Sequence, residues 1–448
     1  MSRSPFFTIA IPTKNRTDQL RNAVRSVREQ SFDEVEIIVC DNSDEPHAPA
    51  VAAIVAATED PRVRYVRTSG NLSMPDNWER AIADARGEYV GILTDRSVFR
   101  RDALSLVHAE IEHSGTPVVG WFPDQYGRDP AGTMFKRRVC SGERREFDSH
   151  ELLSYFAHGH PTAGSKLLPK LMTAVCHRSV IEQVKRSPLG RMCPPVCPDY
   201  TSGYLMVAHT ERIVLLDDSL FVSCGLGNGS AFRRRGPLAD RFRRDLGMSW
   251  SDLVDRMPTD ACFTHALVLN DLMRLRETLP EAFAVCDLDL PRYYAGCLLD
   301  YFRASRAGAD LAEDYDSLIE GLNREDDDVQ RWVRSRQVYL EAMAVLPPER
   351  GRSSEVDPDA DAPDDDLPRF PTVFDALDWG ERTPRPLGPN VLLAMPGLDS
   401  FSPYYAFRHR DDTAGPEGPA LPSDEAGPEG VAGPEGPTPQ SDTAAGGA

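Results

Sequence analysis

Residues 6–44 read FFTIAIPTKNRTDQLRNAVRSVREQSFDEVEIIVCDNSD, and this stretch decides the fold class. Apolar runs at 6–12 and 35–41 flank the segment 19–30, in which apolar residues recur at helical spacing. An apolar strand, an amphipathic helix and a second apolar strand predict a strand–helix–strand unit with two parallel, buried strands. We therefore expect an α/β fold that begins with the first strand.

The same alternation continues to about residue 125. Helical patterns at 49–57, 75–85 and 101–113 are interleaved with predicted strands at 63–67, 88–94 and 118–122. This order predicts a Rossmann-like, mostly parallel sheet with flanking helices. We expect this α/β domain to extend over residues 1–235.

Composition changes along the rest of the chain. Helical periodicity dominates 236–348 and predicts a helical subdomain. An acidic linker is expected at 349–366, a partly ordered segment at 367–410, and a disordered Gly/Pro/Glu tail at 411–448. Within the partly ordered segment, VFDALDW and NVLLAMPG are a helix and a strand that either dock on the body or remain separate.

Charge and hydropathy exclude several classes of partner. Fifty basic and seventy acidic residues give −20, and the last hundred positions, with 20 acidic and 7 basic residues, carry −13 of it. The body therefore offers no general attraction for nucleic acid or anionic lipid. No apolar stretch reaches the ~18 residues of a membrane span, and nine scattered cysteines suit reduced thiols, so we expect a cytoplasmic protein.

Polar residues follow the predicted strands, where parallel sheets bind ligands. PTKNR at 12–16 follows the first strand, CDNSD at 40–44 ends the second, and Gly70 and Asn71 turn the chain before the helix that contains Asn77. A later strand ends at Asp95. Taken singly, each edge is also explained by ordinary turn and helix-cap chemistry.

In this order and spacing, PTKNR, CDNSD, GN, Asn77, ARGEYVGIL at 85–93 and Asp95 resemble the motifs of the family 2 inverting glycosyltransferases, which have the GT-A fold. The resemblance implies transfer of a sugar from a nucleoside diphosphate donor, such as a UDP-sugar, to an acceptor hydroxyl. It also implies the residues that bind the donor nucleotide: Pro12, Thr13, Asn15, Arg16, Asp41, Asn42, Asn71, Asn77 and Asp95.

The family's acidic metal motif is incomplete in this chain. Where the family has Asp-x-Asp, residues 94–97 read TDRS, so only Asp95 remains. The resemblance implies a divalent cation, Mg²⁺ or Mn²⁺, which Asp95 with Ser97 would bind weakly while diphosphate and water supply the other ligands. Alternatively, Arg96 or the arginines Arg233–Arg235 neutralise the diphosphate directly.

The expected general base lies in the segment CPDYTSGYLMVAH at 197–209. Inverting transfer needs one carboxylate to take the proton of the acceptor hydroxyl. The resemblance assigns this role to Asp199, which stands before a helical run and is also a plausible N-cap.

Two other functions compete with transfer. A non-catalytic glycosyltransferase-like protein that binds a nucleotide-sugar or acts as a scaffold fits the incomplete metal motif. A sugar-1-phosphate nucleotidyltransferase has a related fold, but it needs a glycine-rich loop after the first strand, and PTKNR has none.

Overall fold

The computed structural model describes residues 4–129, 132–158, 167–224, 237–306, 309–345, 368–385 and 387–388, all of which fall within one compact unit. The expected linker at 349–366, the tail at 411–448, the segment NVLLAMPG and Arg233–Arg235 lie outside the described residues. The boundaries of the sequence-predicted domains stay predictions.

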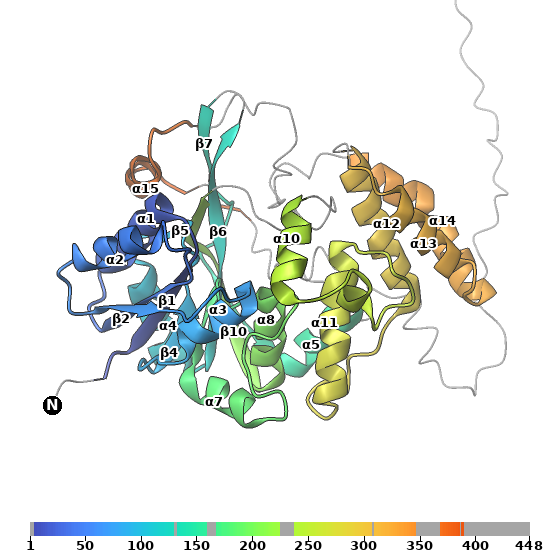
Figure 1. Cartoon of the computed structure of the whole chain (residues 1–448), viewed down its shortest axis with the longest axis horizontal. Helices are drawn as coiled ribbons and strands as arrows, with labels where there is room; N and C mark the ends of the chain where they lie inside the picture. The colour runs from blue at the N-terminus through green and yellow to red at the C-terminus, as the bar shows by residue number, and fades with distance from the viewer. Residues whose placement is uncertain are drawn as a thin grey trace, which may run out of the picture. The chain divides into compact units, whose positions relative to one another are not determined.

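A mixed ten-stranded sheet forms the centre of the fold (Figure 1). Its main path runs β3-β2-β1-β4-β9-β6-β10-β5, with β7 paired to β6 and β8 paired to β10. The strands are β1 (Phe7–Thr13), β2 (Val35–Asp41), β3 (Val63–Arg67), β4 (Tyr89–Ile92), β5 (Ser97–Phe99), β6 (Val118–Asp129), β7 (Gly132–Lys136), β8 (Arg144–Asp148), β9 (Ala174–His177) and β10 (Arg212–Cys224).

The expected α/β class with flanking helices is confirmed, and the parallel part of the sheet is its N-terminal part. Strands β3, β2, β1 and β4 are mutually parallel, as are β6 and β10. Strands β5, β7, β8 and β9 pair antiparallel with their neighbours, which makes the sheet mixed. The first strand runs one residue further than expected, to Thr13, because Pro12 lies beyond the β4 pairing, where no ladder partner requires its N–H.

Three helices bury their apolar stripes against one face of this sheet. Leucine, valine and isoleucine side chains of α1 (Thr17–Arg28), α2 (Ala48–Ala56) and α4 (Ala103–Ser114) join the inward residues of β1 and β2 in one core. Side chains alternate along a strand, so the opposite face of β1 and β2 is left for α3 (Met74–Ile82), which contacts both strands. This packing fixes the carboxyl ends of β1, β2 and β4 beside one another.

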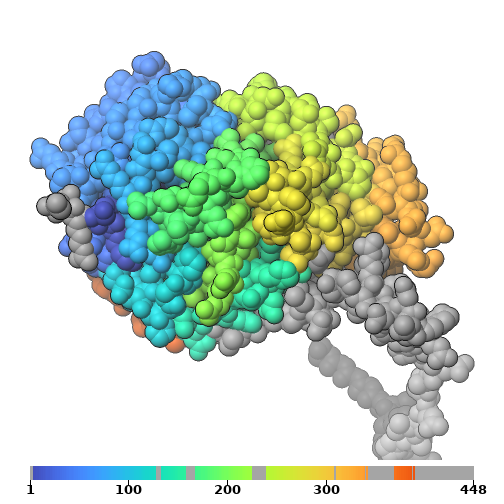
Figure 2. All heavy atoms as spheres, turned by 90° about the horizontal axis from the view of Figure 1, so that it is seen from below, coloured from blue at the N-terminus to red at the C-terminus, as the bar shows by residue number. Residues whose placement is uncertain are grey.

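The second half of the described chain is mainly helical. Helices α5 (Ser149–His158), α7 (Arg178–Arg186) and α8 (Pro198–Ala208) accompany the later strands. Helix α11 contacts α8, and the atoms of the two regions adjoin in Figure 2. The other elements are α10 (Pro237–Leu246), η1 (Ser251–Val254), α11 (Thr264–Thr278), α12 (Leu290–Arg306), α13 (Ala312–Leu322) and α14 (Asp327–Val345). Among the described residues, none of the helices has the length and apolar character needed to cross a bilayer.

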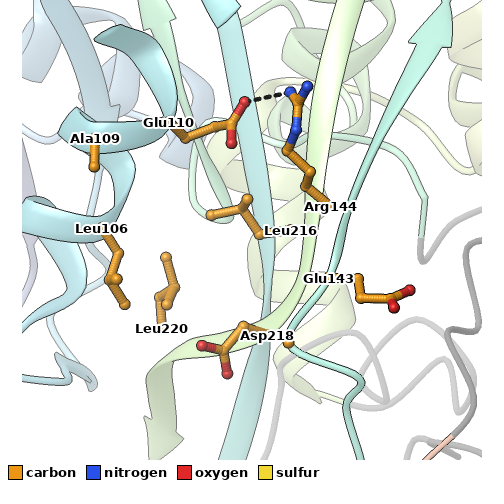
Figure 3. A pocket seen from close by; sticks show the side chains of 9 residues that line it. Leu106, Ala109, Glu110, Glu143, Arg144, Leu216, Asp218 and Leu220 are labelled. Atoms are coloured by element: carbon orange, nitrogen blue, oxygen red, sulfur yellow. Dashed lines mark hydrogen bonds and ion pairs between the residues drawn. The ribbon is translucent and has the colours of Figure 1, made fainter. Parts of the chain in front are cut away.

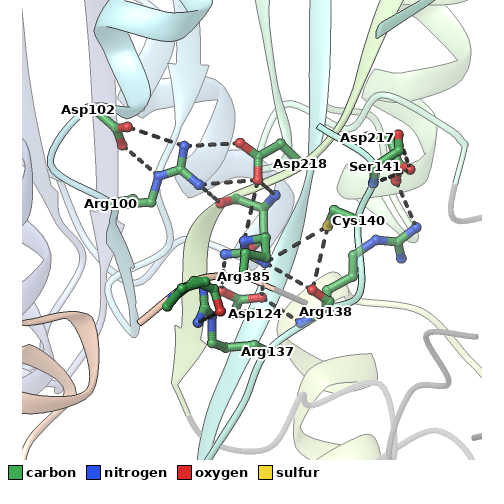
Figure 4. A network of polar contacts seen from close by, with 12 residues as sticks. Arg100, Asp102, Asp124, Arg137, Arg138, Cys140, Ser141, Asp217, Asp218 and Arg385 are labelled. Carbon is green, nitrogen blue, oxygen red and sulfur yellow. Dashed lines mark hydrogen bonds and ion pairs between the residues drawn. The ribbon is translucent and has the colours of Figure 1, made fainter. Parts of the chain in front are cut away.

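A C-terminal segment docks on the sheet. The sequence VFDALDW begins the helix α15 (Val373–Arg382), which lies beside α1 (Figure 1), and the Arg25 guanidinium stacks over the Phe374 ring at 3.9 Å. Beyond the helix, Nη2 of the half-buried Arg385 lies 2.7 Å from Oδ2 of the buried Asp124, inside a polar network that reaches Arg100 through Asp218 (Figure 4). The docked alternative therefore holds for the helix.

Candidate functional site

The carboxyl ends of β1 and β4 bring together three of the sequence-predicted donor residues. Thr13 Oγ1 donates to Asp95 Oδ2 at 2.9 Å, and Arg16 Nη1 donates to Asp95 Oδ1 at 3.1 Å. Asp95 is only 2% exposed, whereas the Arg16 side chain is 39% exposed. Thr13 and Arg16 therefore hold the Asp95 carboxylate, and the positive charge of Arg16 beside it is partly exposed to solvent.

The turn after β1 is tied to the turn after β2 through Asn15. Asn15 has a φ of 60°, in the left-handed region that asparagine tolerates better than most residues. Its backbone N–H donates to Ser43 Oγ at 2.9 Å, and its side-chain amide exchanges two hydrogen bonds with Asp44. The hydrogen bond from Asn15 holds the pKa of Asp44 below its ordinary value.

Asp41 lies deeper than sequence reasoning suggested, because it is fully buried. Its carboxylate accepts from the Ser43 N–H and from the Tyr65 hydroxyl, both at 2.8 Å. Burial and this hydrogen bond raise the pKa of Tyr65 to about 12. Sequence reasoning missed Tyr65 and its neighbour Arg67, whose Nη1 donates to the Asp41 backbone oxygen at 2.9 Å, because nothing marks VRYVR except its β propensity.

The remaining asparagines occupy different environments. The side-chain amide of the buried Asn42 donates to the Leu72 backbone oxygen and accepts from the Leu72 N–H, at 2.9 Å each. It thereby holds the loop that contains the exposed Asn71.

Asn77 is 5% exposed in the first turns of α3, and its Oδ1 has no hydrogen-bond partner among the described residues. A buried amide oxygen without a partner is costly in a folded protein unless a ligand or water satisfies it.

The residues around Asp95 fit a resident cation site poorly. Among the described residues, no three His, Cys, Asp or Glu side chains converge as metal ligands would. Both Asp95 oxygens already accept hydrogen bonds, and the Ser97 hydroxyl is buried and bonded to Thr94 Oγ1 at 2.7 Å. A divalent cation here would therefore depend on oxygen ligands brought by the bound substrate.

Arg96 follows Asp95 directly in the chain. Burial and the nearby positive charge of Arg16 lower the pKa of the Arg96 guanidinium, and the negative charges of Asp95 and Asp199 oppose this shift. The other arginines that sequence reasoning considered, Arg233–Arg235, are not among the described residues.

Asp199 lies in the first turn of α8, and the expectation that it caps the helix is wrong. Pro198 takes the first helical position and Cys197 the N-cap position, so Asp199 lies two residues after the cap. Its side chain is 25% exposed and pairs with Lys170, whose Nζ lies 3.1 Å from Asp199 Oδ2 and 3.5 Å from the Tyr200 ring centre.

Lys170 is a site residue that sequence reasoning missed, and a glycine explains how it reaches α8. Any Cβ at Gly203 would come within 2.6 Å of Leu168 Cγ, so only glycine lets the 168–170 segment approach the helix this closely. No motif marks this segment; the signal was the glycine inside an otherwise apolar helical run.

The nine cysteines are all free thiols. Burial raises the pKa of both Cys193 and Cys197 well above the ordinary value, so these thiols beside the expected base stay protonated and unreactive.

A separate hollow of about 610 Å³ lies between α4, β8 and β10 (Figure 3). Leu106, Leu216 and Leu220 form its apolar part, and the Arg144–Glu110 ion pair crosses one side at 2.7 Å. None of the sequence-predicted site residues lines it. Its other lining residues are Ala109, Gly142, Glu143 and Asp218.

Residues 8–181 match the family model "Glycosyl transferase family 2". Two curated relatives align with about a quarter of the chain: a GalNAc(5)-diNAcBac-PP-undecaprenol beta-1,3-glucosyltransferase of Campylobacter jejuni (27% identity, 26% of this chain and 38% of that protein) and the succinoglycan biosynthesis protein ExoO of Rhizobium meliloti (27% identity, 26% and 33%). The chain thus spans little more than a third of the curated relatives it matches.

Two solved structures show weak overall similarity. TarS 1–349 of S. aureus in complex with UDP has 14% identity and a TM-score of 0.39, with 75% of this chain and 89% of that chain covered. The mannosyltransferase PcManGT of Pyrobaculum calidifontis, in complex with GDP-Man and Mn²⁺, has 19% identity and a TM-score of 0.36, with 77% and 87% covered.

Proposed function

We propose that the chain transfers a sugar from a nucleoside diphosphate donor to an acceptor hydroxyl, with inversion at the anomeric carbon, because residues 8–181 match the model "Glycosyl transferase family 2". One observation carries the proposal: Thr13 and Arg16, after the first strand, both donate to the buried Asp95 carboxylate, which follows β4. Asp95 lies within residues 8–181, and Asp199 lies beyond them. The donor cluster is therefore in the family-matched part of the chain.

The donor nucleotide, proposed as UDP, occupies the carboxyl ends of β1, β2 and β4. Three observations support this placement: the clustered polar turns, the outward cation of Arg16, and the buried Asn77 oxygen that has no partner. Asp41 contributes through Tyr65 and Ser43, since its own oxygens are covered. The proposed donor-binding set remains Pro12, Thr13, Asn15, Arg16, Asp41, Asn42, Asn71, Asn77 and Asp95, in which the buried Asp41 and Asn42 act by holding their neighbours in place.

Asp199 is the proposed general base. As the acceptor oxygen attacks the anomeric carbon, the Asp199 carboxylate takes the hydroxyl proton. The bond between the anomeric carbon and the diphosphate oxygen breaks, and its electron pair leaves with the nucleoside diphosphate. The partial exposure of Asp199 supports this role, because an acceptor must be able to reach it.

Arg16 and Arg96 stabilise the negative charge that develops on the leaving diphosphate. Guanidinium groups bind phosphate oxygens through charge-assisted hydrogen bonds, and such contacts strengthen as charge develops. A divalent cation, Mg²⁺ or Mn²⁺, is proposed to bind together with the donor rather than as a resident cofactor. Asp95 would be its one carboxylate ligand from the protein. Ser97 would first have to leave its bond to Thr94.

A donor panel tests the proposal. The full-length protein is incubated with UDP- and GDP-sugars, with and without EDTA, and released nucleoside diphosphate is measured. The proposal expects release from at least one donor, and sensitivity to EDTA then reports whether a cation travels with the donor. The single carboxylate at residues 94–97 favours one rival, a binding-only protein, which predicts nucleotide affinity by calorimetry and no release.

A further inference from the structure

The loop at residues 191–197, RMCPPVC, leads directly into the helix that carries Asp199, and it is held by carboxylates from two separate elements. On one side, Glu79 of α3 accepts from the backbone N–H groups of Met192 and Cys193 through Oε2, at 2.8 Å each. On the other side, Asp271 of α11 accepts from Val196 through Oδ1 and from Cys197 through Oδ2, also at 2.8 Å each. Two carboxylate side chains therefore accept hydrogen bonds from four backbone N–H groups of this short loop.

The Asp271 contact is costly to build. Asp271 is 1% exposed, and burial raises its pKa to about 6 even though both backbone hydrogen bonds lower it. A buried carboxylate is expensive unless specific donors satisfy it. Because Met192, Cys193 and Val196 are fully buried, the backbone N–H groups of this loop need acceptors within the protein, and Asp271 supplies two of them.

Cys197 is the N-cap residue of α8, so its position sets the start and direction of the helix. Asp199 follows two residues later, where a small shift of the cap moves the carboxylate by a similar amount. Glu79 belongs to α3, two residues after Asn77. Hydrogen bonds to the loop therefore come from α3 on one side and from α11 on the other.

We infer that Asp271 and Glu79 are positioning residues for the general base: together they clamp the 191–197 loop and so place Asp199 relative to the bound donor. This inference rests on the proposed function. It assigns to α11, a helix outside the family-matched residues, a part in catalysis that is distinct from packing.

The test compares three variants with the full-length wild type. Asp271→Asn keeps the shape of the side chain but replaces one acceptor by an NH₂ group that faces a backbone N–H. Asp314→Asn is the matched control, because Asp314 is equally buried and accepts at 2.8 Å from the N–H of Cys262, a residue outside the 191–197 loop. Glu79→Gln tests the other clamp at a less buried position.

The readouts are the affinity for UDP by calorimetry, and kcat and KM for release of UDP from whichever UDP-sugar the wild type cleaves fastest. A misplacement of about 1 Å costs on the order of a hundredfold in rate, so we expect Asp271→Asn to lower kcat by tenfold or more. Donor KM and UDP affinity should stay within about twofold, and Asp314→Asn should leave kcat within about twofold at temperatures below its unfolding transition.

Equal kcat values for Asp271→Asn and Asp314→Asn would overturn the positioning role. If Asp271→Asn does not fold, Glu79→Gln decides, since a kcat equal to that of the wild type rejects the clamp. A wild type that releases no nucleoside diphosphate from any donor in the panel refutes the proposed function itself, and the positioning role with it.

Discussion

The pKa of Asp271 makes folding stability depend on pH in a direction opposite to that of most aspartates. Its pKa rises from 3.8 to about 6 in the folded protein, chiefly because the carboxyl is fully buried. The folded state therefore binds the proton more tightly than the unfolded state. Its contribution to stability is complete below pH 3.8 and is lost as the pH rises through 6.

The size of this effect follows from the shift. About two pKa units at 1.36 kcal/mol each give roughly 3 kcal/mol in total, and about half of that is lost between pH 5 and pH 7. Replacement by asparagine removes the titration, while the hydrogen bond that it also disturbs adds an offset independent of pH. The stability of the wild type relative to Asp271→Asn should thus fall by about 1.4 kcal/mol between pH 5 and pH 7.

Urea unfolding of both proteins at several pH values, followed by tryptophan fluorescence, measures this difference. Other titrating groups change both proteins alike and cancel in the comparison. A difference that is flat with pH, or one that grows in favour of the wild type as the pH rises, would refute a neutral, buried Asp271.

Three further predictions concern the donor site, the docked segment and the tail. Arg96→Met should weaken UDP binding by about 10- to 100-fold in calorimetry, since a charge-assisted hydrogen bond is worth about 1.5–3 kcal/mol, and unchanged affinity would exclude Arg96 from the diphosphate site. Arg385→Met leaves the buried Asp124 carboxylate without its partner and should lower the free energy of unfolding by about 3 kcal/mol; a loss below about 1 kcal/mol would mean that the C-terminal segment adds little to stability. Truncation after Asp411 should leave UDP affinity within about twofold at physiological salt, where charges beyond about 8 Å are screened, and a large loss would place the tail in the site.

Local pattern predicted the regular elements well. The apolar run at 35–41 became β2 without a shift, because a buried parallel strand needs only a short apolar sequence. The run VRYVR at 63–67 became the half-buried β3 with the expected bounds, because valine and tyrosine favour strands. The amphipathic segments of the second half became α11 to α14, because their apolar residues recur at helical spacing. The short strands β5 and β8 were not predicted, since three to five residues with mixed polarity have no periodicity to detect.

The candidate site was predictable as far as it depends on strand ends. Thr13, Arg16 and Asp95 meet because parallel strands align their carboxyl ends, which the order of elements already implied. Lys170 and Asp271 reach the Asp199 region from distant segments, and their roles depend on tertiary packing that no local pattern encodes. Asp199 itself was expected to cap its helix, but Pro198 begins the helix one residue earlier.

Turnover by Asp199→Asn tests the central claim most directly. The variant keeps the size of the side chain and removes the proton acceptor. The rate of nucleoside diphosphate release or of sugar transfer should therefore fall by about 100-fold or more, as expected for the loss of a general base. UDP affinity, measured on the same preparation, should stay within about twofold, because the donor residues lie on other elements. Turnover within a few-fold of the wild type would show that Asp199 is not the base and would contradict the proposed mechanism.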